Sequence, residues 1–91
     1  MISFILGEDR HVKFRVHSTD GEPFTIREGT YRLLYAGEEE AAGECHIIED
    51  VTERFLDIKL QPLKRSKCYI LEITLKIADE VVMDREQMEV I

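Results

Sequence analysis

The strongest constraint on the fold is the segment Lys67–Ile77, in which every second residue from Tyr69 to Ile77 is apolar. Successive side chains of a β-strand point to opposite faces, so this pattern predicts a strand with one face in a core. A helix would not keep so many alternate residues on one side. The apolar positions are Tyr69, Leu71, Ile73, Leu75 and Ile77. We therefore predict that Leu71, Ile73 and Leu75 form the central core strand.

Shorter segments of the same character occur along the rest of the chain and predict further strands. They are Ile2–Leu6, His11–Ser18, Thr30–Ala36, Cys45–Ile48, Arg54–Leu60 and Val81–Ile91. Pro23 has no amide donor, so we expect Glu22–Ile26 to be an edge strand or a kinked connector. The apolar phase changes across Asp84–Gln87, which predicts a bulge there. Glu38–Ala42, bracketed by two glycines, is expected to be an acidic hairpin loop that returns through Ala41 to Ile48.

About seven short strands joined by frequent turns predict an all-β fold. We expect residues 1–91 to form a single domain, an antiparallel immunoglobulin-like β-sandwich, with a small barrel as the alternative. The length of 91 residues is close to that of such sandwiches. Two hallmarks of antibody domains are missing, because the chain has no Trp and no cysteine pair at a convincing spacing.

The charge of the chain limits the partners that it can have. It carries 12 basic and 19 acidic residues, a net charge of −7, which disfavours nucleic acid as a partner. No apolar run approaches the roughly 20 residues needed to cross a bilayer, so no membrane is expected. The short apolar start, Met1–Leu6, has no preceding basic residue and does not fit a signal peptide. We therefore expect a location in the cytoplasm or within a virion-like assembly.

No combination of residues in the sequence predicts catalysis, a cofactor or a metal site. His11 and His17 are six residues apart, about 20 Å along an extended strand. Cys45 and His46 are neighbours and would point to opposite faces. Phosphate-binding glycine motifs and nucleophile motifs are absent. Cys45 and Cys68 are expected to be reduced thiols, and a single bridge between them is the alternative.

Three apolar residues exceed what one small two-layer core needs and are candidates for contact with a partner. They are Phe24, Phe55 and Met88. The alternative is that they form a second core layer or cover a sheet edge. We expect the partner to be another protein or a further copy of this chain, because open sheet edges pair readily with other strands.

The order of strands and turns resembles a known kind of module. The segments that carry the resemblance are Val12–Val16, Asp20–Ile26, Gly29–Leu33 and Lys67–Ile73. Together they resemble the small immunoglobulin-like modules of bacteriophage and prophage structural proteins, such as baseplate, tail and head-fibre components. The resemblance implies a non-enzymatic piece that docks onto its neighbours in a particle. A secreted or surface-displayed binding module, and a small cytoplasmic enzyme or regulator, remain open as alternatives.

Overall fold

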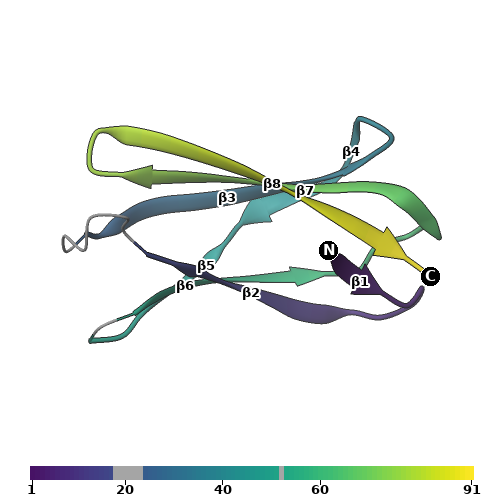
Figure 1. Ribbon diagram of the computed structural model, residues 1–91, viewed down its shortest axis with the longest axis horizontal. Coiled ribbons are helices and arrows are strands. Elements are labelled where there is room, and N and C mark those ends of the chain that lie inside the picture. The colour runs from purple at the N-terminus through teal and green to yellow at the C-terminus, as the bar shows by residue number, and fades with distance from the viewer. Residues whose placement is uncertain (18–23, 52) are drawn as a thin grey trace.

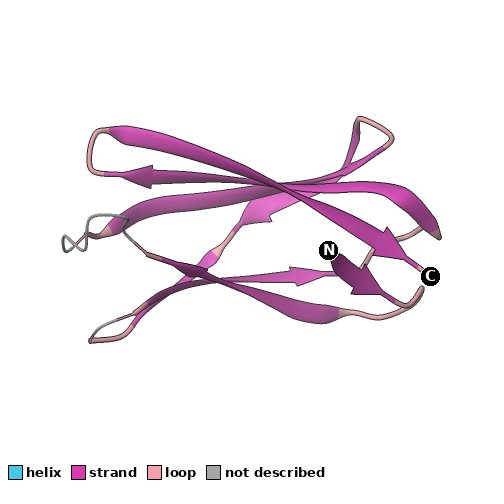
Figure 2. Ribbon diagram, in the orientation of Figure 1, coloured by secondary structure: helices cyan, strands magenta, loops and turns pink. Residues whose placement is uncertain are grey.

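The computed structural model describes residues 1–17, 24–51 and 53–91, and these residues form two facing layers of strands (Figure 1). Figure 2 shows that short loops connect the strands and that the described residues include no helix. The eight strands are β1 (Ile2–Phe4), β2 (Arg10–Val16), β3 (Ile26–Tyr35), β4 (Glu38–Glu44), β5 (His46–Glu49), β6 (Arg54–Leu60), β7 (Ser66–Ile77) and β8 (Glu80–Val90).

The strands form one five-stranded and one three-stranded sheet. The larger sheet has the order β1-β8-β7-β3-β4, and the smaller has the order β2-β6-β5. Neighbouring strands are antiparallel except for β1 and β8, which are parallel. The predicted all-β fold with two mostly antiparallel sheets is therefore confirmed.

The central strand of the larger sheet is β7, as the alternation predicted. Leu71, Ile73 and Leu75 are all buried on its inner face. Across the interior, strand β6 contributes the buried residues Leu56, Ile58 and Leu60 to the same core. The prediction of the central core strand is thus confirmed, and the core is the layer between β7 and β6.

The chain passes from the larger sheet to the smaller at Cys45, between the end of β4 and the start of β5. The amide of Cys45 donates a hydrogen bond of 2.8 Å to the carbonyl of Gly29 on β3. A Cβ on Gly29 would lie 3.3 Å from the side chains of Leu56 and Leu75, a tight contact that these side chains would have to relieve by a small shift. The expected hairpin is present, since Ala41–Glu44 pairs with β3. Its extension to Ile48 is wrong, because the chain changes sheets at Cys45.

The acidic segment Glu38–Ala42 was expected to be a loop, and it is part of strand β4. The turn that precedes β4 is only two residues long. Both Ala36 and Gly37 have positive φ, at 49° and 85°, as in the tight turns that match the twist of a hairpin. Pairing therefore starts at once, with Tyr35 opposite Glu38.

The expected bulge at Asp84–Gln87 is also wrong. Strand β8 pairs with β7 in unbroken register from Gln87 back to Glu80, and the register shifts instead between Ser66 and Tyr69 on β7. Asp84 and Glu86 occupy inward positions of β8. The apolar residues of the strand therefore change faces along the sequence, although the register is continuous.

The expected edge strand Glu22–Ile26 falls partly outside the described residues, which omit Glu22 and Pro23. Within them, Phe24 and Thr25 belong to no strand, and Ile26 is the first residue of β3.

Replacing Leu71 by Ala should lower the free energy of unfolding by about 3 kcal/mol, because it removes buried apolar volume and leaves a cavity. Urea denaturation measures the change. Ile70→Ala is the matched control, since Ile70 is the partly exposed neighbour on the opposite face, and it should cost less than half as much. Equal losses for both variants would contradict the assignment of the core face.

Candidate functional site

A groove of about 400 Å³ runs along one open side of the sandwich, between β2 and the first half of β8. One wall is formed by Phe14, Arg15 and Val16 of β2 and by His17, the residue after this strand. The other wall is formed by four residues of β8: Val82, Met83, Asp84 and Glu86. The buried core residues Leu56, Ile73 and Leu75 also line it. The groove therefore gives access to the apolar interior between the two sheets.

The groove is open because, among the residues that the structure describes, the two strands beside it have no neighbour on that side. Strand β2 is the end strand of its sheet. The short strand β1 covers β8 only at Met88–Val90, so residues 80–87 of β8 form an edge within the described part of the chain. Edge strands present unpaired amides and carbonyls that can pair with another strand. Two such edges flank the groove.

Two carboxylates lie on the groove-facing side of β8. Asp84 is opposite Ile73 and Glu86 is opposite Leu71 in the register with β7, so both share the inward face of the sheet. Every Lys, Arg and His belongs to the described residues, and none of them forms an ion pair with Asp84 or Glu86. Asp84 accepts one hydrogen bond of 3.0 Å, from the amide of Arg85. The groove is thus largely apolar, with an acidic wall on β8, while Arg15 and His17 line the opposite wall.

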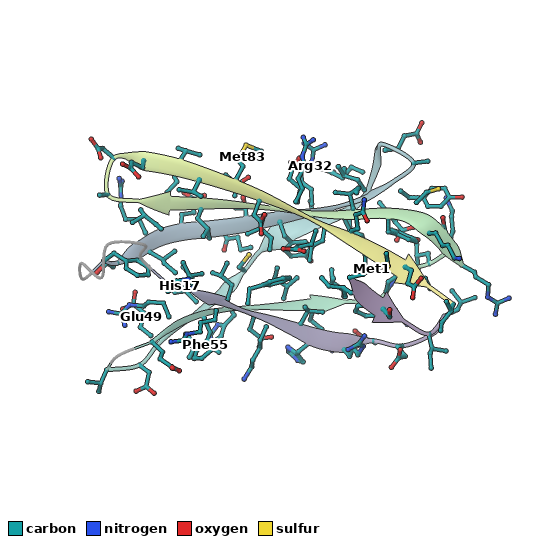
Figure 3. All side chains as sticks on the ribbon, viewed as in Figure 1. Met1, His17, Arg32, Glu49, Phe55 and Met83 are labelled. Atoms are coloured by element: carbon teal, nitrogen blue, oxygen red, sulfur yellow. The ribbon has the colours of Figure 1, made fainter. Side chains whose placement is uncertain are left out.

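The outer face of the same sheet holds a row of ion pairs that orients β8. Glu72 on β7 is buried, and one of its oxygens lies 2.9 Å from Nη2 of Arg85. Its other oxygen is 3.4 Å from Nη1 of Arg32. Figure 3 shows Arg32 and Met83 on this outer side. Because Arg85 is held there by Glu72, its charge does not neutralise the acidic groove wall.

Tyr69 forms a buried polar junction at the start of β7. Its hydroxyl donates a hydrogen bond of 2.7 Å to Glu40 Oε1 and accepts one of 3.1 Å from the amide of Lys64. Burial, and then the hydrogen bond to Glu40, raise the pKa of Tyr69 to about 12. The junction ties β4 and the loop before β7 to the central strand.

The three predicted contact residues are not brought together. Met88 is only 1% exposed and pairs with Ile2 and Tyr69, so its prediction as a surface contact is wrong. It fills the core because β1 covers this end of β8. Phe24 is half-buried against the core, 6.0 Å from the guanidinium of Arg54.

Phe55 lies on the outer face of the smaller sheet, the opposite side of the molecule from Met83 (Figure 3). It is half-buried between Arg15 and Ile48 on the neighbouring strands. Phe55 therefore shares no surface with the groove.

The cysteines and histidines form no joint site. Both cysteines are free, with Cys45 buried and Cys68 exposed, and burial raises the pKa of the Cys45 thiol to about 11. His11 Nδ1 lies 3.0 Å from Asp57 Oδ1. Among residues 1–17, 24–51 and 53–91, no group of three or more His, Cys, Asp or Glu side chains could hold a metal ion. The same residues contain no helix long and apolar enough to span a membrane.

The groove could not be predicted from the sequence, because strand order decides which edges stay open. One signal was present: Asp84 and Glu86 share the phase of Met88 and Val90, so two acids occupy positions that the strand pattern assigns to the core.

The fold and the groove define a two-sheet β-sandwich with an open side. Comparison of the chain with protein-family models, with curated protein sequences and with solved structures finds no significant match.

Tyr69→Phe should lower the free energy of unfolding by about 1 kcal/mol at neutral pH through loss of the hydrogen bond to Glu40. Above pH 10 the wild type should lose stability relative to the variant, so that the difference vanishes and then changes sign. Tyr69 ionises first in the unfolded chain, because its pKa is about 12 when folded and 10 normally. The stabilisation is therefore complete below pH 10 and is lost as pH rises through 12, by up to about 2–3 kcal/mol. Urea denaturation across this range gives the difference, and a constant difference would contradict the assignment.

Ellman's reagent should modify one thiol of the native protein and two after unfolding in guanidinium chloride. Cys68 is exposed, whereas Cys45 is buried with a raised pKa, and only an accessible thiolate reacts. The control Cys68→Ser should show no rapid reaction in the native state. Rapid modification of two thiols, or of none, in the native wild type would show that the placement is wrong.

Proposed function

We propose that the chain is an immunoglobulin-like interaction module that binds another protein through the groove between β2 and β8 and performs no catalysis. The observation that carries this proposal is the pair of open strand edges beside exposed apolar surface. Such edges bind extended segments by strand addition.

The immunoglobulin-like assignment has support from the order of the strands. In that fold one sheet contains strands B, E and D in spatial order B-E-D, and the other contains C, F and G. The order β2-β6-β5 corresponds to B-E-D, and β3-β7-β8 corresponds to C-F-G. Strand β4 then takes the place of an additional strand beside C, as in variable-type domains.

A second feature supports the same assignment. Immunoglobulin-like domains carry a tyrosine near the start of strand F whose hydroxyl is hydrogen-bonded to the backbone a few residues upstream. Tyr69 is near the start of β7, and its hydroxyl accepts from the amide of Lys64, five residues upstream. This feature is independent of strand order, because it depends on one side chain and one loop.

The kind of partner follows from the resemblance of the sequence to phage and prophage structural modules. We propose that the chain is a component of such a particle or of its assembly, where small sandwiches act by docking. Particle genes beside the coding gene would support this assignment.

Val82→Arg should abolish capture of the partner in a pull-down from the source organism. Val82 is 43% exposed on the groove side of β8, so a long cation there fills the groove and neutralises its wall. Val81→Arg is the matched control, with the same substitution on the outer face, and it should capture the partner as the wild type does.

Circular dichroism should be used to check that both variants are folded. A protein captured equally by both variants, or no specific capture by the wild type, would contradict binding through the groove.

A further inference from the structure

We propose, on the basis of the function proposed above, that the groove binds an extended segment of another protein. Every second residue of this segment faces the groove. These residues are one apolar residue beside Val82 and two basic ones, and their order in the segment depends on whether it runs parallel or antiparallel to β8. The segment adds to the free edge of β8 alongside residues 81–87, with its basic side chains next to Asp84 and Glu86.

The position of the added strand follows from where β1 stops. Strand β1 occupies the edge of β8 at Met88–Val90 only, and the edge continues free from Gln87 back to Glu80 within the described residues. A strand placed there lies in line with β1. Its inward side chains then face Phe14 and Val16 on the other wall of the groove. Arg15 and His17 also line that wall, and the guanidinium of Arg15 lies 3.5 Å from the carboxylate of Glu53.

The spacing of the partner residues follows from strand geometry. Val82, Asp84 and Glu86 are alternate residues that share the inward face of β8. Alternate residues of a strand are roughly 7 Å apart, and a neighbouring strand has the same repeat. An added strand therefore places one residue beside each of the three, which requires one apolar and two further positions.

The charge of those two positions follows from the acidic wall. Asp84 and Glu86 form no ion pair with any basic residue of this chain, all of which are described. A strand with apolar or acidic residues beside them would desolvate or repel the carboxylates. Opposite charges beside each other on adjacent strands are favourable, so Lys or Arg matches both positions.

A second copy of the chain fits the groove less well. Each copy has a net charge of −7, and edge pairing of β8 with another β8 would bring the two acidic walls together. Like charges across strands are destabilising. The acidic wall therefore selects against self-pairing as well as for a basic segment.

The test uses synthetic seven-residue peptides with capped ends. One is Thr-Val-Thr-Lys-Thr-Lys-Thr, and a second has the reverse order, so that parallel and antiparallel addition are both covered. Two controls carry Glu in place of Lys. Binding to the full chain is measured by nuclear magnetic resonance titration, which also follows the amides of residues 81–87.

One of the Lys peptides should bind at least about tenfold more tightly than its Glu counterpart. The alternate amides of residues 81–87 that point to the free edge, away from β7, should become protected from exchange. The double variant Asp84→Asn/Glu86→Gln should bind the Lys and Glu peptides equally. Val82→Arg should bind neither, whereas Val81→Arg should bind as the wild type does.

Three results would overturn the inference: no binding of either Lys peptide, equal binding of Lys and Glu peptides to the wild type, or a preference that survives in the double variant. If neither Lys peptide binds, the role of Asp84 and Glu86 is instead to protect the sheet edge against aggregation. The pull-down separates the two proposals. If it still depends on Val82, the groove is the binding site and only the basic segment is wrong.

Discussion

The structure depends on the burial of one face of β7 against β6. Strand β7 lies at the centre of the larger sheet, so its inner residues are shielded by strands on both sides and by the smaller sheet below. Apolar area removed from water is the main source of folding free energy at this size. The strands around β7 are short or partly exposed. Each of them is positioned so that it helps to bury the inner face of β7 against β6.

The sequence was sufficient for the fold class because its strongest alternation coincides with the most buried strand. Tyr69, Leu71 and Ile73 are inward both by pattern and in the structure. Strand β4 could not be predicted from its composition. Its glutamates and small residues have low strand propensity, and it forms because the tight turn at Ala36 and Gly37 places it beside β3.

The site was less accessible to prediction than the fold. Phe24, Phe55 and Met88 were chosen as surplus apolar residues, yet Met88 is in the core because β1, at the other end of the sequence, pairs over it. Such a contact between distant segments leaves no local signal. The groove also depends on the order of distant strands. Among the described residues, no strand pairs with the outer edge of β2 or with the first half of the outer edge of β8. Asp84 and Glu86 hold positions that a stability-optimised strand would give to apolar residues, a placement that is expected at functional sites and at protected sheet edges.

The parallel pairing of β1 with β8 has a mechanical consequence. Ile2 is opposite Met88 and Phe4 is opposite Val90, and the ladder continues through Ile91, which exchanges hydrogen bonds with Phe4 and Leu6. The two ends of residues 1–91 therefore leave this ladder in opposite directions, in agreement with the positions of N and C in Figure 1. Tension applied to both ends slides the strands along each other and loads all of these hydrogen bonds together, whereas a hairpin pulled at its open end breaks them one by one. Strand β1 therefore resists such tension through the shear of its ladder with β8, together with the packing of Phe4 and Val90 in the core.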